Sequence, residues 1–168
     1  MDIWGGKQFQ MRLELIPADL PISVDNIYYE FGKWDLLPES VAALDSLSEL
    51  LVLNPTTVIE LMAHSDCRGD DAINSEISQK RAQSVVSYLI AKGIQPGRLV
   101  AKGYGETAPK TVTKKLSEAY PFLKQGKELT CSYIESLADE KEREICHQIN
   151  RRTEFRVLSS DYKEKFEK

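Results

Sequence analysis

Two residues of opposite charge, Asp66 and Arg81, carry the clearest chemical signal in the sequence. Asp66 follows the apolar run at 58–62 and lies in a short turn that Gly69 closes. If a helix follows this turn, steps of four residues give one stripe: Ile73, Ile77, Arg81, Val85 and Leu89. Arg81 is the only charged member of this stripe. A cation in such a place is costly to bury unless a partner pairs with it.

Asn74 and Ile77 are expected to share a site with this charged pair. Asn74 precedes Arg81 by two helical turns, so both side chains lie on roughly the same face, with Ile77 between them. Asp66 reaches the same place if it lies beyond the carboxyl end of a strand, where ligands collect in such sheets. An aspartate suits an ammonium, and a guanidinium binds a carboxylate in a bidentate fork. Spacing alone leaves a plain alternative open, a structural ion pair between Asp66 and Arg81.

Several segments read as β-strands because their apolar residues alternate or run continuously. They are residues 8–15, 22–31, 56–63, 98–105 and 152–158. The last segment alternates cleanly, which predicts one buried and one solvated face. The face predicted to be solvated carries Arg152, Glu154 and Arg156.

Helices are predicted between these strands. One starts at Pro38, in a position where a first helical turn tolerates proline, and stops at Asn54. A second runs from the turn at Gly69 to about Lys92. The polar segment 110–149 is largely helical in pattern. The predicted caps are Gly93 at the end of the second helix and Asp139 at the start of the last one.

The order of these elements predicts an α/β (α+β) fold. Its mixed sheet has about four core strands with helices packed on it, in the order βαβαβ, helical insert, β. The predicted boundaries are 1–21 for a strand and linker from a preceding region, 22–158 for the domain and 159–168 for a solvated tail. The insert occupies 110–149.

Composition excludes several classes of function. The net charge of −4 is spread over the chain without a basic stripe, which argues against nucleic-acid binding. No apolar stretch approaches the ~20 residues of a spanning helix. The N-terminus has no apolar core of the signal-peptide type, so the chain is either cytoplasmic or a piece of a longer exported protein.

Catalytic and metal-binding interpretations have weaker support. Three cysteines form no CxxC pair, and His64 has no partners at zinc spacing, so no metal or cofactor is expected. A Cys67–His64 nucleophile lacks a third orienting group. Acidic residues near the start of the second helix could mimic a glycosidase pair, but such residues ordinarily complement the helix dipole: Asp70, Asp71 and Glu76.

Three separated motifs resemble the C-terminal domain of the OmpA family, which is shared with the Pal lipoproteins and the MotB stators. The family pattern is HTD, a glycine three residues on, N-x-x-L-S-x-x-R-A, G-Y-G-E and N-R-R. Here the corresponding stretches are HSDCRG, NSEISQKRA, GYGE and NRR. They occur in the same order, and the resemblance covers about residues 24–158.

The resemblance implies non-covalent binding of peptidoglycan through the diaminopimelate of its stem peptide. In the family the aspartate of HTD and the arginine of R-A hold this ligand, which implies roles for Asp66 and Arg81. The other implied ligand-binding residues match the remaining motif positions or the rim of the site: Ser65, Asn74, Ile77, Arg151, Phe31 and Gly32. Diaminopimelate ends in an amino-acid zwitterion, so the family ligand agrees with the chemistry of the charged pair.

The long insert resembles OmpA-like domains that end multidomain outer-membrane lipoproteins of Bacteroidota, some of them in secretion or gliding machinery. This resemblance implies the periplasmic face of the outer membrane, with membrane attachment only through the rest of the protein. Envelope or secretion-system proteins are then further candidate partners. In an oxidising periplasm, Cys131 and Cys146 are a candidate disulfide within the insert, and Cys67 is a third candidate.

Three functions remain open at this point. The favoured one is a binding module that anchors an envelope complex to peptidoglycan. The second is a peptidoglycan hydrolase or amidase that uses Cys67 with His64 or the acidic cluster. The third is an assembly domain without a ligand.

Overall fold

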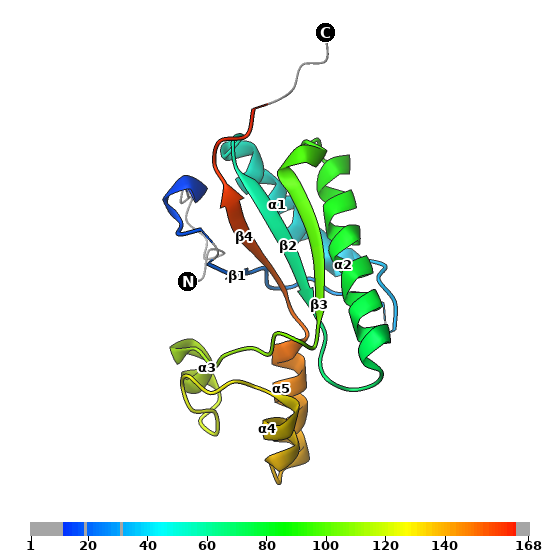
Figure 1. Ribbon diagram of the computed structural model, residues 1–168, viewed down its shortest axis with the longest axis vertical. Coiled ribbons are helices and arrows are strands. Elements are labelled where there is room, and N and C mark those ends of the chain that lie inside the picture. The colour runs from blue at the N-terminus through cyan, green and yellow to red at the C-terminus, as the bar shows by residue number, and fades with distance from the viewer. Residues whose placement is uncertain (1–11, 19, 31, 164–168) are drawn as a thin grey trace.

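A computed structural model describes residues 12–18, 20–30 and 32–163, and its sheet has four strands (Figure 1). The strands are β1 (Ile22–Ser23), β2 (Val58–His64), β3 (Leu99–Gly105) and β4 (Thr153–Ser159). Their order across the sheet is β1-β4-β2-β3. β2 and β3 are parallel, whereas β4 is antiparallel to both β1 and β2. The predicted mixed α+β sheet is therefore confirmed.

Helices cover one face of this sheet and extend from one end of it. The longer helices are α1 (Val41–Leu53), α2 (Asp71–Ala91) and α5 (Glu140–Asn150). The shorter ones are α3 (Lys114–Ala119), α4 (Cys131–Ser136) and the 3-10 turns η1 (Leu13–Leu15), η2 (Pro38–Ser40) and η3 (Pro96–Arg98). α1 and α2 pack on the sheet, while α3, α4 and α5 form a separate group at the end where β2 and β3 finish (Figure 1). Among the described residues, no helix has the length and apolarity needed to cross a membrane.

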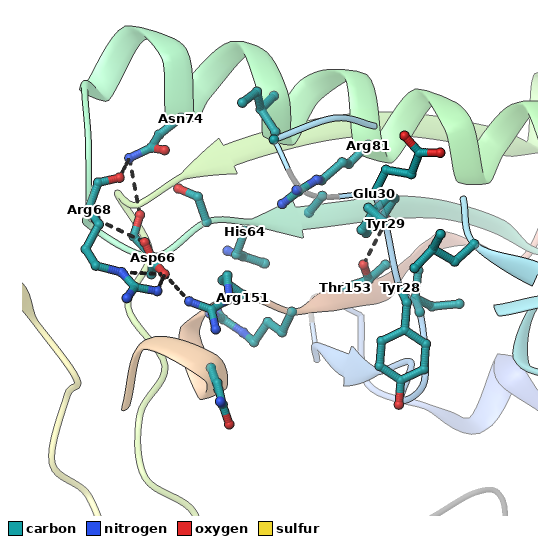
Figure 2. A pocket seen from close by; sticks show the side chains of 18 of the residues that line it. Tyr28, Tyr29, Glu30, His64, Asp66, Arg68, Asn74, Arg81, Arg151 and Thr153 are labelled. Carbon is teal, nitrogen blue, oxygen red and sulfur yellow. Dashed lines mark hydrogen bonds and ion pairs between the residues drawn. The ribbon is translucent and has the colours of Figure 1, made fainter. Parts of the chain in front are cut away.

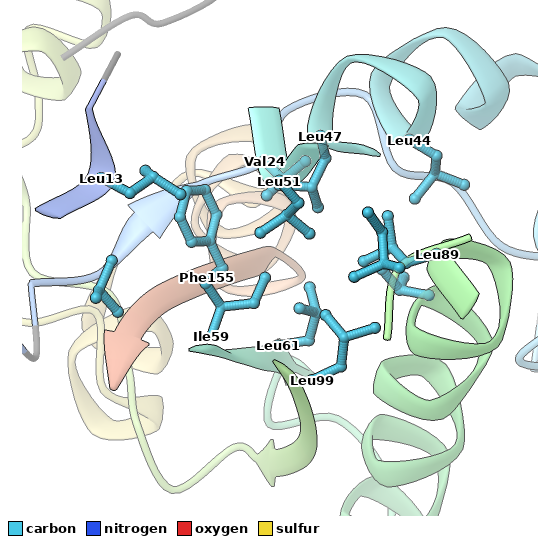
Figure 3. Packing of buried hydrophobic residues seen from close by; sticks show 13 residues of the cluster. Leu13, Val24, Leu44, Leu47, Leu51, Ile59, Leu61, Leu89, Leu99 and Phe155 are labelled. Carbon is cyan, nitrogen blue, oxygen red and sulfur yellow. The ribbon is translucent and has the colours of Figure 1, made fainter. Parts of the chain in front are cut away.

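The main core lies between the sheet and its two covering helices (Figure 3). It is built from fully buried apolar side chains of every layer, among them Leu44, Leu47, Leu51, Ile59, Leu61, Val85, Leu89 and Phe155. The helical spacing in α1 and the continuous apolar run in β2 place their apolar residues on the core side. The stripe along α2 is not uniformly buried, because Ile73 is 56% exposed while Leu89 is fully buried. Arg81 thus lies where α2 leaves the core.

The N-terminal strand predictions are only partly correct. Of the predicted strand 8–15, residues 8–11 lie outside the described part, and Leu13–Leu15 form a 3-10 turn instead. Leu13 still enters the core, with its N–H donating to Asn54 Oδ1 at 2.9 Å. In the run 22–31, strand β1 ends at Ser23, and the left-handed backbone conformation of Asn26 (φ 64°) interrupts extended structure. Beyond it, Tyr29 forms an isolated antiparallel bridge with Leu36.

A glycine in β3 lets α2 approach the sheet closely. A Cβ on Gly103 would lie 2.1 Å from the backbone nitrogen of Gln79, so only glycine fits at this crossing. The Gln79 side chain then hydrogen-bonds the edge of β3, donating to Ala101 O at 3.1 Å and accepting from Gly103 N at 2.8 Å. These bonds fix the height of α2 above the sheet, and with it the positions of the polar residues that α2 carries.

The predicted helix caps are confirmed, but one face of β4 differs from the prediction. The Asp139 side chain accepts hydrogen bonds from two backbone N–H groups of α5, and Gly93 adopts φ 95° after α2. Glu154, expected on a solvated face, is only 2% exposed. It is buried because Lys110 and Arg152 lie over it, each within ion-pairing distance of its carboxylate.

The insert has a small core of its own and is tied to the Asp66 turn by a disulfide. Its buried cluster consists of Val112, Leu123, Leu129, Ile134 and Cys146. The disulfide joins Cys67 to Cys131, so the candidate pair Cys131–Cys146 was wrong. The pairing follows from burial: Cys146 faces the insert core on α5, whereas Cys131, at the start of α4, lies against the turn after Asp66.

Peptide mapping of oxidised protein should recover a Cys67–Cys131 linked peptide and one free thiol. Burial raises the pKa of the Cys146 thiol to about 11, so this residue stays protonated and unreactive near neutral pH. Alkylation should therefore modify no cysteine in the native protein and one, Cys146, after denaturation. Recovery of a Cys131–Cys146 peptide would contradict this pairing.

Candidate functional site

The described residues predicted to bind ligand line a single cleft of about 1310 Å³ (Figure 2). These residues are Gly32, Ser65, Asp66, Asn74, Ile77, Arg81 and Arg151. They come from the loop after β1, the end of β2, helix α2 and the start of β4, elements that are far apart in sequence. Phe31, the remaining predicted residue, lies outside the described part of the chain.

Asp66 lies on the floor of the cleft and is held by two arginines. Its side chain is 9% exposed. Oδ1 accepts from the backbone N–H of Arg68 at 3.0 Å. Oδ2 accepts from Nη2 and Nε of Arg68, at 2.7 and 3.2 Å, and from Nη1 of Arg151. Burial alone would raise the pKa of the Asp66 carboxyl, but the hydrogen bonds from Arg68 and Arg151 outweigh it and keep that pKa below its usual range.

Arg81 points from α2 into the same cleft but does not pair with Asp66 (Figure 2). Its Nε donates to the carbonyl of Lys33 at 3.0 Å, and its guanidinium carbon lies 4.8 Å from the centre of the Tyr29 ring. Within the described ranges, no carboxylate lies within ion-pairing distance of Arg81. The plain alternative, a structural Asp66–Arg81 ion pair, is therefore not what the structure contains.

Burial of Arg81 lowers the pKa of its guanidinium, and nearby Arg151 adds to this effect. The group stays charged, because an arginine does not lose its proton in a protein. A partly desolvated cation beside a second arginine is a favourable position for an anion. The nearest chemical match is a carboxylate, which a guanidinium binds through two parallel hydrogen bonds.

Asn74 shapes the turn that holds Asp66. Its Nδ2 donates to the backbone carbonyls of Asp66 at 3.3 Å and Arg68 at 3.2 Å, and to Glu106 Oε2 at 2.9 Å. Glu106 is the last residue of the GYGE motif, so this contact explains why that motif and Asn74 occur together. The N-cap of α2 is Asp70, whose side chain accepts from two backbone N–H groups of the first turn.

Asn150 and Ser65 explain two further motif positions. The buried Asn150 side chain accepts from Lys110 N–H at 2.9 Å, at the start of the insert, and donates to Leu129 O at 2.8 Å, in the middle of it. These bonds tie the insert to the residue just before Arg151. Ser65 Oγ is buried beside the cleft and has no hydrogen-bond partner in the part of the chain that the structure describes. Asn150 therefore positions Arg151. The Ser65 hydroxyl, next to Asp66, remains available to form a hydrogen bond with a ligand.

Sequence reasoning missed several residues that line the cleft, among them Tyr29, Arg68, Glu144 and Gln148. Glu144 on α5 accepts from Arg68 Nη1 at 2.8 Å and from Arg151 Nη2 at 3.0 Å. It lies 76 positions from Arg68 in the sequence, so spacing gives no sign of the contact. The sequence does contain a signal for Tyr29, because a cation in an otherwise apolar stripe needs an aromatic or anionic neighbour.

The groups considered for catalysis have other roles. Cys67 is in the disulfide, so it supplies no thiolate. His64 is 5% exposed, stacks on Tyr104 with ring centres 5.2 Å apart and lies 3.3 Å from Glu154. Glu76 pairs with Lys80 at 2.6 Å on the outer face of α2. No cluster of three potential metal ligands occurs among the residues described.

Comparison with known proteins agrees with this fold. Residues 28–120 match the model of the OmpA family. Outer membrane protein A of Shimwellia blattae is 42% identical over 88 residues, which cover 51% of this chain and 36% of that protein. The chain therefore spans about a third of the length of this relative.

Two solved structures share the fold. The peptidoglycan-associated lipoprotein from Burkholderia pseudomallei aligns with a TM-score of 0.54 and 20% identity, over 78% of this chain and 87% of that one. The cell wall anchor of the T6SS from Pseudomonas aeruginosa aligns with a TM-score of 0.54 and 21% identity, over 82% and 78%. Since the family match extends over more than half of the sequence and includes β2, α2 and β3, the chain belongs to the OmpA family.

Proposed function

We propose that this domain binds peptidoglycan non-covalently through the diaminopimelate of the stem peptide. The observation that carries the proposal is the convergence of Asp66, Arg81 and Arg151 on one cleft from three separate elements. Their charges match the zwitterionic end of diaminopimelate, with the carboxylate on Arg81 and the ammonium on Asp66. A named relative in fold, the peptidoglycan-associated lipoprotein, supports the same ligand.

The walls of the cleft suit the remainder of the ligand. Ile77 and the Tyr29 ring line the cleft and offer apolar surface to the methylene chain of diaminopimelate. Gly32 lines the cleft with φ 67°, a backbone conformation that glycine adopts without strain. The ligand is therefore held at its charged end by side chains and along its length by apolar contact.

The domain retains its ligand and does not transform it. OmpA-family domains are non-enzymatic. We infer that the protein anchors an outer-membrane or periplasmic complex to the cell wall. The T6SS cell wall anchor among its fold neighbours makes secretion machinery a specific candidate, as does the resemblance to Bacteroidota lipoproteins. This role places the domain in the periplasm, with the remainder of the envelope complex as its further partner.

The choice of stem peptide tests this proposal. A peptide that contains diaminopimelate should bind more tightly than the same peptide with lysine, because lysine offers an ammonium but no carboxylate for Arg81. Loss of that charge-assisted contact should weaken binding about ten- to a hundredfold. Isothermal titration calorimetry with the two peptides measures the difference. Equal affinities would overturn the zwitterion assignment, and absence of binding to both would overturn the proposed function.

A further inference from the structure

The carboxylate that the ligand ammonium needs is already occupied in the protein. Asp66 Oδ2 receives three donors, two from the Arg68 side chain and one from Arg151 (Figure 2). A carboxylate oxygen has about two lone-pair directions, so a further donor competes with those already present. Oδ1 accepts the backbone N–H of Arg68. An ammonium that binds Oδ2 therefore has to displace one of the two guanidinium groups.

Arg68 is the group that can leave more easily. Its side chain is 52% exposed, compared with 33% for Arg151, so water compensates more of its lost contacts. Glu144 contacts both arginines, through Arg68 Nη1 at 2.8 Å and Arg151 Nη2 at 3.0 Å, so it does not distinguish them but offers Arg68 a partner outside Asp66. Rotation away from Asp66 leaves Arg68 paired with Glu144. Arg151, by contrast, is fixed beside Asn150 at the junction of α5 and β4.

Departure of the Arg68 side chain does not disturb the geometry of Asp66. The backbone N–H of Arg68 donates to Oδ1 at 3.0 Å, independently of the side chain. Asn74 holds the same turn through the carbonyls of Asp66 and Arg68. Asp66 would therefore keep its orientation while one side of Oδ2 becomes available.

We propose that Arg68 is an internal competitor of the ligand, whose guanidinium occupies the ammonium position on Asp66 and turns to Glu144 when the diaminopimelate ammonium binds. This inference rests on the proposed function. It makes Arg68 a gating residue that tunes affinity, and it gives the insert a role in binding through Glu144 on α5. The ligand then binds less tightly than it would bind a cleft with a free Oδ2, because part of the binding free energy is used to displace Arg68.

Removal of the Arg68 side chain should therefore raise affinity. The free energy of a partly exposed ion pair corresponds to a factor of about two to five in a binding constant, and we expect a gain in affinity of this size. Arg68→Ala should bind the diaminopimelate stem peptide tighter by this factor in calorimetry, and Arg68→Lys should return affinity toward that of the wild type. Arg12→Ala is the matched control, since it removes an exposed arginine outside the cleft and should change nothing.

A peptide with an acetylated diaminopimelate amine distinguishes competition for Asp66 from a general effect of removing the Arg68 charge. This ligand has no ammonium, so Arg68→Ala should not improve its binding. Melting temperatures of all variants should stay close to the wild type, and Arg68→Gln provides a second variant if the alanine form does not fold. Tighter binding of both peptides by Arg68→Ala would overturn the competitor role. So would an unchanged affinity of Arg68→Ala for the free-amine peptide, provided that the wild type binds this peptide. If the wild type binds neither peptide, the proposed function itself fails and this inference with it.

A double-mutant cycle tests the part played by Glu144. Glu144→Ala removes the second partner of Arg68, so Arg68 should remain on Asp66 and the free-amine peptide should bind less well. The loss should be smaller when Arg68 is already alanine, because no side chain then has to be released. An equal loss in both backgrounds would show that Glu144 acts without Arg68 and would overturn its role in release.

Discussion

Arg81→Ala is expected to abolish most of the affinity for the diaminopimelate stem peptide while the protein stays folded. The guanidinium is the one described cation of α2 that lines the cleft, and removal of a charge-assisted contact to a carboxylate should cost about 1.5 to 3 kcal/mol. This corresponds to roughly ten- to a hundredfold in the dissociation constant. Arg81→Lys should fail as well, because an ammonium cannot form the bidentate fork.

The neighbouring residue on α2 provides a control for the loss of charge. Lys80 lies over the Trp34 ring, 4.0 Å from its centre, and pairs with Glu76, both away from the cleft. Lys80→Ala should therefore bind the peptide like the wild type. The contacts of Arg81 with Lys33 and Tyr29 are structural, so Arg81→Ala should lower the melting temperature slightly. A large fall in melting temperature with unchanged affinity in the folded fraction would contradict the receptor role.

Glu154→Gln is expected to reduce the free energy of unfolding by about 3 to 5 kcal/mol near neutral pH, because it leaves a buried positive cluster without its anion. The Glu154 side chain is 3% exposed and lies within ion-pairing distance of Lys110, 3.1 Å from Arg152 Nε and 3.3 Å from His64 Nε2. Urea unfolding measures the change. Lys114→Ala, which removes one partner of an exposed pair with Glu118, is the control and should have little effect.

The same cluster predicts how stability depends on pH. Burial alone would raise the pKa of Glu154, but His64, Arg152 and Lys110 hold it far below the ordinary value of 4.5. Burial also lowers the pKa of His64 from 6.5. Both groups bind protons more readily in the unfolded chain, so their contributions are present at neutral pH and are lost as the pH falls. Stability should decline below about pH 6.5 and more steeply below about pH 4.5. An equally steep decline in Glu154→Gln would contradict the assignment to Glu154.

Much of the site could be predicted from the sequence because it depends on local periodicity. Asn74, Ile77 and Arg81 share one face of α2, and helix geometry alone brings them together. Asp66 joins them because a turn at the carboxyl end of a buried strand opens toward the following helix. Every predicted site residue that the structure describes lines the same cleft, and its role in ligand binding stays a prediction.

Several of the contacts that prediction missed depend on the insert. Alternation in β4 shows which side of the sheet Glu154 faces, but it cannot show that Lys110 covers that side. The Cys67–Cys131 bond and the Arg68–Glu144 pair likewise join the Asp66 turn to residues 64 and 76 positions away. Such contacts follow from how the insert packs against the end of the sheet, and neither spacing nor composition specifies that packing.

Co-sedimentation with purified cell-wall sacculi tests the central claim most directly. The wild-type protein should pellet with diaminopimelate-type sacculi, and free diaminopimelate should release it. Asp66→Ala and Arg81→Ala, each with a melting temperature close to the wild type, should remain in the supernatant, whereas Lys80→Ala should pellet. Persistent binding by folded Asp66→Ala or Arg81→Ala, or wild-type binding that free diaminopimelate does not compete, would contradict a diaminopimelate receptor built on Asp66 and Arg81.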